Sequence, residues 1–181
     1  MNARDAVELL AGAVPARGGA WADLGAGEGL FTRALATRLG PSGVVYAVDR
    51  DVRALAVLRR HAERGALAVT TITGDFTADV VLPDVRQGEL DGLLFANALH
   101  YVRDPAVVLA RWMRWLRPVG RIVVVEYERR RANPWVPFPL PPQGLHDAAL
   151  AAGLSPPVVT ATRPSQFGGN LYVAAIDRAE R

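Results

Sequence analysis

A glycine-rich turn between an apolar segment and a helix-forming segment is the feature that most constrains the fold of this chain. The apolar segment ends at Asp23, and Gly25, Gly27 and Gly29 follow at alternate positions. Glycine has no Cβ, so the backbone at these positions can adopt a positive φ and approach a ligand closely. The free N–H groups at the start of the next helix, together with its dipole, favour an anionic group on that ligand. The sequence therefore predicts a strand, a nucleotide-cofactor loop and a helix, in this order.

Segments with strand-like and helix-like patterns alternate along the rest of the chain. The predicted strands are 20–24, 43–48, 68–73, 91–96, 121–127, 158–162 and 170–176, and the predicted helices are 3–12, 30–39, 51–64, 104–116 and 143–152. Alternation of this kind indicates an α/β fold with helices on both faces of the sheet. The last two strands are joined by a glycine turn instead of a helix, which departs from a simple dinucleotide-binding fold.

The length of the chain, 181 residues, fits one domain over 1–181 with a short helical extension at 1–19. Five prolines between Pro134 and Pro142 exclude a helix or a central strand there, so residues 133–142 are predicted to form a stiff proline-rich loop. The chain has no cysteine, which excludes disulfides, zinc–thiolate sites and a thiol nucleophile. Its histidines and acids show no metal-ligand spacing, and we predict no metal site.

The N-terminal residues carry acids and lack the continuous apolar core of a signal peptide. No apolar run approaches the length of a membrane span. The absence of cysteine suits a reducing compartment. We therefore expect a cytoplasmic protein without a membrane-spanning segment.

The spacing of the glycines separates two kinds of nucleotide cofactor. A dinucleotide fingerprint, G-x-G-x-x-G counted from Gly25, needs its third glycine where this chain has Leu30. The run 23–29, Asp-Leu-Gly-Ala-Gly-Glu-Gly, instead resembles the first motif of the class I S-adenosylmethionine (SAM)-dependent methyltransferases. The resemblance extends over about residues 20 to 177. It implies a Rossmann-like, seven-stranded, mostly parallel sheet with an antiparallel last strand.

The same resemblance implies a set of cofactor-binding residues. The loop would surround the methionine half of SAM, and of the product S-adenosylhomocysteine (SAH), through Asp23, Gly25, Ala26, Gly27 and Gly29. A carboxylate at the end of the second strand matches a vicinal diol, so Asp49, followed by Arg50, is expected at the ribose. An NAD enzyme uses an acid there for a similar reason, so Asp49 alone does not identify the cofactor. Asp75 is expected to accept from the adenine amino group, Phe76 to stack on the purine, and Asn97 to contact the methionine moiety.

The residues after the fourth predicted strand bear on the acceptor. Methyltransferases that act on nucleobase amines usually carry Asn/Asp-Pro-Pro-aromatic here, whereas residues 97–101 read Asn-Ala-Leu-His-Tyr. This edge, the Asp104-Pro105 helix start and the run 116–121 resemble the small-molecule branch of the family, which includes quinone-biosynthesis enzymes. The resemblance implies a small organic acceptor that receives the methyl group by in-line displacement.

A hydroxyl acceptor would benefit from a general base, and His100 is the first candidate because imidazole titrates near neutrality. Packing, or capping of the helix that begins after Asp104, is the alternative role for His100. Glu126, at the end of the fifth predicted strand, is the second candidate, with a surface salt bridge as its alternative. Tyr127 and Trp135 are candidates for the wall of the acceptor pocket.

Three ways of closing the acceptor pocket stay open, because only about 20 residues precede the first strand. The pocket can be open to a large acceptor, the proline-rich segment 133–142 can form a rigid wall, or a second subunit can complete it. We favour the proline-rich wall and leave a homodimer open.

Three other functions also stay open: a non-catalytic SAM-binding module, an NAD-dependent oxidoreductase, and an RNA or protein methyltransferase. The last would use Arg129, Arg130 and Arg131 as a docking surface. The formal net charge of +3 is modest, and no broad basic segment carries interleaved aromatics. We therefore disfavour nucleic acid as a substrate.

Overall fold

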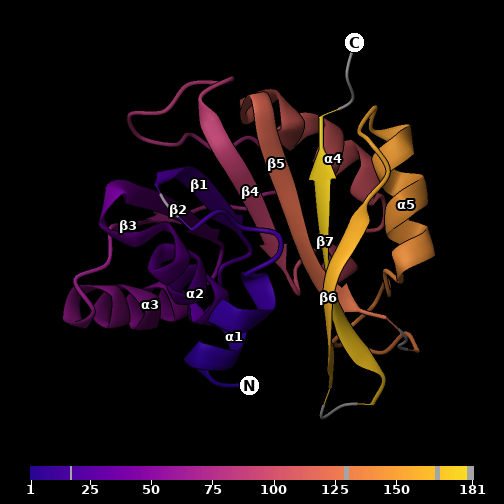
Figure 1. The fold of residues 1–181 in the computed structure, drawn as a ribbon, viewed down its shortest axis with the longest axis horizontal. Coiled ribbons are helices and arrows are strands. Elements are labelled where there is room, and N and C mark those ends of the chain that lie inside the picture. The colour runs from indigo at the N-terminus through magenta and orange to yellow at the C-terminus, as the bar shows by residue number, and fades with distance from the viewer. Residues whose placement is uncertain (17, 129–130, 166–167, 179–181) are drawn as a thin grey trace.

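A seven-stranded sheet lies at the centre of the computed structural model of the protein, which describes residues 1–16, 18–128, 131–165 and 168–178 (Figure 1). The strands are β1 (Gly19–Leu24), β2 (Gly43–Asp49), β3 (Val69–Thr73), β4 (Leu90–Ala96), β5 (Leu116–Tyr127), β6 (Val158–Pro164) and β7 (Asn170–Asp177). The α-helices are α1 (Ala3–Leu10), α2 (Leu30–Leu39), α3 (Val52–Arg64), α4 (Pro105–Trp112) and α5 (Pro142–Ala151). Short 3₁₀ turns are η1 (Gly40–Ser42), η2 (Leu99–Tyr101) and η3 (Met113–Trp115).

The strand order is β3-β2-β1-β4-β5-β7-β6. Strand β7 is antiparallel to both of its neighbours, β5 and β6, whereas the pairs among β1 to β5 are parallel. This confirms the predicted Rossmann-like, mostly parallel sheet with an antiparallel last strand. The order reverses between β1 and β4, and in open α/β sheets ligands bind outside the carboxyl ends of the strands at such a point.

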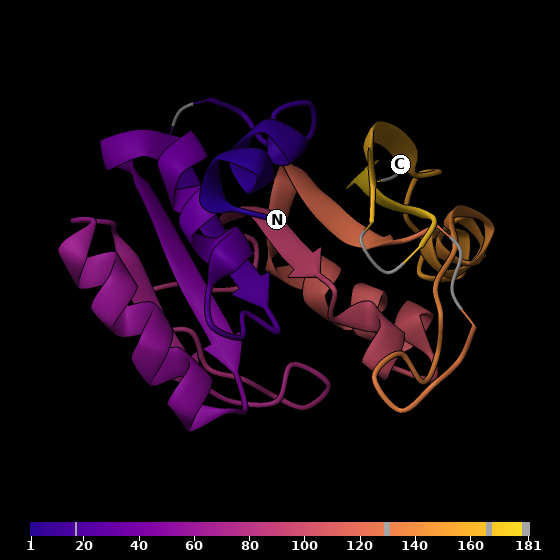
Figure 2. The ribbon, with the colours of Figure 1, turned by 90° about the horizontal axis from the view of Figure 1, so that it is seen from below.

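Alternate strand residues face two separate cores, because successive side chains of a strand point to opposite faces of a sheet. In β4, Leu93 packs with residues of α4 and α5, and Leu94 with residues of α1 and α2. Both leucines are fully buried. Figure 2 shows α1 and α4 on opposite sides of the sheet. Helices on both faces agree with the sequence prediction.

Helices α3 and α4 each begin directly after an aspartate, Asp51 and Asp104. The Asp51 side chain accepts hydrogen bonds from the first-turn N–H groups of α3, and the Asp104 side chain accepts from Val107 N before α4, which has Pro105 in its first turn. A carboxylate at this position satisfies N–H groups that have no partner within the helix. These local signals explain why both starts were predicted within one residue.

The predicted helix 104–116 is too long. Helix α4 ends at Trp112, η3 follows, and β5 begins at Leu116, five residues before the predicted start of that strand. Leu116 is fully buried and pairs with Leu90 of β4 across a register shift. A long-range strand pairing therefore ends the helix, and no local signal in the sequence reports it.

The segments at 1–19 and 133–142 both pack on the domain. Helix α1 buries Ala6, Leu9 and Leu10 and lies against α2, so the N-terminal extension contributes to the core. The proline-rich loop is held by hydrogen bonds from Phe138 N to His100 O and from the Tyr172 hydroxyl to Leu140 O. None of the helices in the described parts of the chain is long and apolar enough to cross a membrane.

Candidate functional site

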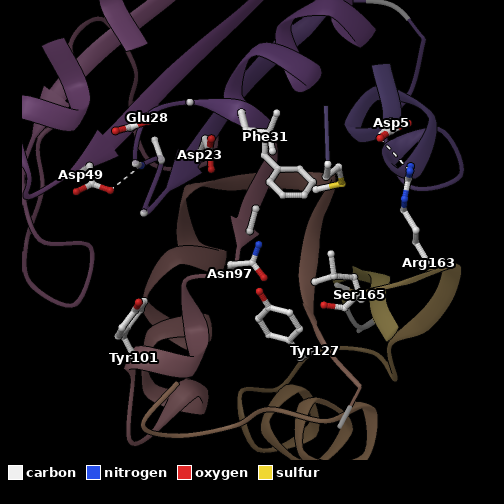
Figure 3. A pocket seen from close by; sticks show the side chains of 18 of the residues that line it. Asp5, Asp23, Glu28, Phe31, Asp49, Asn97, Tyr101, Tyr127, Arg163 and Ser165 are labelled. Carbon is white, nitrogen blue, oxygen red and sulfur yellow. Dashed lines mark hydrogen bonds and ion pairs between the residues drawn. The ribbon is translucent and has the colours of Figure 1, made fainter. Parts of the chain in front are cut away.

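Two adjoining cavities lie at the carboxyl ends of β1, β2 and β4, where the strand order reverses. The larger has a volume of about 760 Å³ and the smaller about 390 Å³. Gly25, Asp49, Asn97 and Tyr101 line both cavities. Figure 3 shows the larger cavity, with Asp49 at one side and Asp5 and Arg163 at the other.

The glycine loop after β1 has the backbone that the sequence predicts. Gly25, Gly27 and Gly29 have φ of 84°, 53° and 82°. A Cβ at Gly25 would lie 2.7 Å from Ala98 Cβ, and a Cβ at Gly29 would overlap Leu58, whereas Gly27 has no neighbour within 4 Å. Gly27 therefore borders open space and needs glycine for its backbone angle alone.

The loop is tied to the end of β2. Gly25 N and Ala26 N donate to Val48 O at 2.9 and 3.0 Å, and Gly27 N donates to Asp49 Oδ2 at 2.7 Å. Asp49 Oδ1 accepts from Asp51 N at 2.8 Å. These bonds fix the Asp49 carboxylate where the two cavities meet.

Asp23 is a buried acid beneath the loop, and its side chain is 1% exposed. The Thr32 hydroxyl donates to Asp23 Oδ2 at 2.6 Å, while Oδ1 has no hydrogen-bond partner within the described chain. Burial raises the pKa of Asp23 to about 7, with a smaller contribution from the charge of Asp49, against the opposing effect of the Thr32 bond. A bound cation would favour the ionised form and satisfy Oδ1.

The side chain of Asn97 carries another buried oxygen without a hydrogen-bond partner among the described residues. Its φ is 53°, a left-handed conformation that asparagine tolerates better than most residues, and Asn97 N donates to Val125 O at 2.8 Å. The side-chain Oδ1 is buried and has no partner among the residues that the structure describes. Two acceptor oxygens that lack donors thus belong to residues lining the larger cavity.

The residues predicted to hold adenine lie around the smaller cavity with Arg50. Asp75 Oδ1 accepts from both the backbone N and the hydroxyl of Thr77, at 2.8 and 2.7 Å, which leaves Oδ2 for another donor. These bonds lower the pKa of Asp75 from its usual value, and Arg50 contributes less. Phe76 packs edge-on against Phe95, with ring centroids 5.8 Å apart.

The two candidate catalytic residues contact each other. His100 Nδ1 lies 2.7 Å from Glu126 Oε2, and His100 N donates to Glu126 Oε1 at 3.1 Å. Their exposed fractions are 3% and 0%, so a surface salt bridge of Glu126 is ruled out. Neither His100 nor Glu126 is among the described residues that line the two cavities. The centroid of the His100 ring lies 4.5 Å from that of Tyr101 and 6.2 Å from that of Tyr127. Both tyrosines line the larger cavity.

The far end of the larger cavity differs from the prediction. Tyr127 lines it as expected, but its described lining contains no residue of 133–142, and Trp135 is 77% exposed. The structure therefore does not show the predicted proline-rich wall at this cavity. Residues in or next to α1, α2, β6 and β7 form this end instead: Met1, Asp5, Phe31, Arg163, Pro164, Ser165 and Leu171.

Sequence reasoning missed these residues because they come together only through the packing of α1 near β6. The Asn2–Asp5 capping box marks the start of α1 in the sequence but does not reveal its neighbour. Of the basic run, Arg129 and Arg130 lie outside the described residues, and Arg131 is exposed. The described residues contain no cluster of three or more potential metal ligands.

Comparison with known proteins identifies the family. Residues 22–124 match the family model described as a methyltransferase domain. This chain belongs to the methyltransferase-domain family. The chain is 30% identical over 151 residues to nocamycin O-methyltransferase of Saccharothrix syringae. The aligned region covers 78% of this chain and 48% of that protein.

Two further proteins resemble this chain, one in sequence and one in fold. An uncharacterised 37.1 kDa protein in transposon TN4556 of Streptomyces fradiae is 36% identical over 125 residues, 68% of this chain and 35% of the relative. The chain thus spans about half or less of the curated relatives that it matches. The structure of Burkholderia thailandensis 1,6-didemethyltoxoflavin-N1-methyltransferase with bound 1,6-didemethyltoxoflavin and SAH has a TM-score of 0.75 to this chain. The two chains are 23% identical, and the match covers 98% of this chain and 78% of that one. It shares the fold.

Proposed function

We propose that this methyltransferase domain binds SAM at the carboxyl ends of β1, β2 and β4 and transfers its methyl group to a small organic acceptor. The observation that carries the proposal is the pair of unpartnered buried oxygens, Asp23 Oδ1 and Asn97 Oδ1, beside the glycine loop. The ammonium group of SAM offers three donors to such acceptors. Family membership and the likeness to an O-methyltransferase support methyl transfer.

Each part of the cofactor has a matching region in the two cavities. We assign the methionine half to the glycine loop and the larger cavity, the ribose to Asp49, and the adenine to the smaller cavity. The residues assigned to these contacts are Asp23, Gly25, Ala26, Gly27, Gly29, Asp49, Arg50, Asp75, Phe76 and Asn97. The position of Asp49 at the junction supports the assignment, since the ribose connects the other two parts.

When bound, SAM supplies an electrophilic methyl group on a sulfonium, so the chain needs mainly to position the acceptor and exclude water. Phe31, Tyr101 and Tyr127 provide apolar and aromatic walls for this purpose. We further propose that His100, oriented by Glu126, serves as general base for a hydroxyl acceptor. The ring contacts of His100 with Tyr101 and Tyr127 support a position close to the acceptor.

Binding of SAH by variants at Asp49 tests the cofactor assignment. Asp49→Ala should weaken SAH binding by about 1 to 3 kcal/mol, because a charged hydrogen-bond acceptor is lost. Isothermal titration calorimetry measures this change, with Glu63→Ala, which removes an exposed acid of α3 outside both cavities, as the matched control. Undiminished binding by a folded Asp49→Ala protein would place the ribose elsewhere, and tight binding of NAD instead of SAH would indicate an oxidoreductase.

Methyl transfer itself is tested with SAM carrying a labelled methyl group and a metabolite panel. We expect label in a small organic product, whereas SAH binding without any transfer would indicate a non-catalytic module. Membership of the quinone-biosynthesis branch stays a prediction, and the identity of the methylated product will test it. A homodimer also stays a prediction, and the mass of the protein in solution will test it.

A further inference from the structure

An ion pair closes the end of the larger cavity that lies away from the glycine loop. Arg163 Nη2 of β6 lies 2.9 Å from Asp5 Oδ2 of α1, and their side chains are 39% and 22% exposed. Figure 3 shows this pair opposite Asp49, with Phe31 between the two sides and Ser165 and Tyr127 nearby. The pair thus borders the half of the cavity that the proposed function leaves to the acceptor.

Arg163 is the single cationic side chain among the described residues that line the larger cavity. The acids in that lining are Asp5, Asp23, Glu28 and Asp49. The proposed function uses Asp23 and Asp49 for the cofactor, and Arg163 is the one cationic side chain that the described lining offers to an acceptor. A guanidinium is always charged and presents five N–H donors in a planar fork that matches a carboxylate. The bond to Asp5 uses one of its nitrogens, Nη2.

Asp5 holds Arg163 in a fixed direction. Asp5 Oδ2 accepts from Asn2 N at 3.2 Å, and Asp5 N donates to Asn2 Oδ1 at 2.9 Å, so the carboxylate belongs to the capping box of α1. The Asn2 N–H, and then Arg163, lower the pKa of Asp5 from its usual value. The carboxylate therefore stays ionised at neutral pH. A guanidinium held in this way loses less rotamer freedom on binding an anion.

The surroundings of Arg163 favour an apolar ligand body. Phe31, Tyr127 and Leu171 line the same cavity as Arg163, and Phe31 and Leu171 are buried. Aromatic and aliphatic walls with one charged group at the end are typical of pockets that orient a small molecule. The N–H groups of Arg163 that do not contact Asp5 would favour an anionic group placed directly against them.

We infer that the methyl acceptor is a small organic acid, with an apolar or aromatic body in the cavity and a carboxylate bound by Arg163, which Asp5 positions. This inference rests on the proposed function, because it places the acceptor beside the cofactor. Arg163 sets specificity by binding the acceptor, and Asp5 is a positioning residue.

Binding of a matched acid and amide tests the inference. The probes are 1-naphthoate and 1-naphthamide, titrated by NMR into protein saturated with SAH. We expect the acid to bind at least about tenfold more tightly than the amide, as a charge-assisted bidentate contact predicts. Arg163→Gln should reduce this preference to within about threefold, and Arg163→Lys should keep part of it. Arg60→Gln, which removes an exposed charge on α3, should leave it unchanged.

Asp5→Asn gives a second, milder variant, since it weakens the ion pair but keeps a side chain of similar size. It should lower the affinity for the acid several-fold with little effect on the amide, a pattern that a general loss of stability does not produce. Equal affinity of wild-type protein for acid and amide, including no detectable binding of either, would overturn the inference, as would a preference that survives in Arg163→Gln. Failure of the wild-type protein to bind SAH in the same samples would instead overturn the proposed function.

Discussion

At the scale of single residues, the environment of Asp23 is the most informative. Its identity as the acid before the glycine loop was predicted from the motif alone, but its burial and its unpartnered Oδ1 were not. A pKa depends on the groups that the fold brings around a side chain, here the core beneath the loop and the charge of Asp49. The sequence can name such a residue but cannot give its protonation.

The raised pKa of Asp23 predicts a pH dependence of stability. The folded pKa of about 7 lies above 3.8, the usual value for an aspartate, so the folded state binds this proton more tightly than the unfolded state does. The stabilisation that this tighter proton binding gives the folded state is fully present below about pH 4, and it is lost as the pH rises through 7. At about 1.4 kcal/mol per pKa unit, this difference corresponds to roughly 4 kcal/mol.

Urea denaturation of ligand-free protein at pH 5 and pH 8 measures this effect. We expect Asp23→Asn, which keeps an oxygen for the Thr32 hydroxyl, to lose much less stability between the two pH values than the wild-type protein. The same pH dependence in both proteins would show that Asp23 is not the titrating group.

At the scale of elements, local signals determine what could be predicted. Asp51 and Asp104 mark helix starts through side-chain bonds to nearby N–H groups, and Gly29 marks the start of α2 through its left-handed backbone. These boundaries agree with the structure. The end of α4 at Trp112 could not be predicted, because it depends on the pairing of Leu116 with Leu90. The position of η2 likewise depends on a distant residue, since Glu126 bonds both the backbone and the ring of His100.

The proposed base role predicts the effect of His100→Asn. Asparagine can keep a donor for Glu126 near the position of Nδ1 but lacks Nε2, the nitrogen left for proton transfer. The rate of methyl transfer should fall about 100-fold or more, as expected for loss of a general base, while SAH affinity is unchanged. Rates with saturating acceptor measure this, with His146→Asn on α5 as the control. An unchanged rate in a folded His100→Asn protein would leave His100 and Glu126 a purely structural pair.

At the scale of the whole molecule, the two halves of the site differ in how far the sequence reveals them. The residues proposed to bind the cofactor lie at or just after the carboxyl ends of β1, β2, β3 and β4, so motif positions and strand order suffice to bring them together. The acceptor half joins Asp5 near the start of the chain to Arg163 near its end. No local pattern encodes that contact, so the sequence pointed to the proline-rich segment, which does not line the larger cavity among the described residues.

A crystal structure of the protein with SAH would show whether one continuous site at the strand ends receives the cofactor. We predict the Asp49 carboxylate within about 2.6 to 3.2 Å of both ribose hydroxyls. We also expect the adenine beside Phe76 and the ammonium against Asp23 and Asn97. SAH bound elsewhere, or these two cavities empty in crystals grown with saturating SAH, would show that the cofactor site is not at the strand ends.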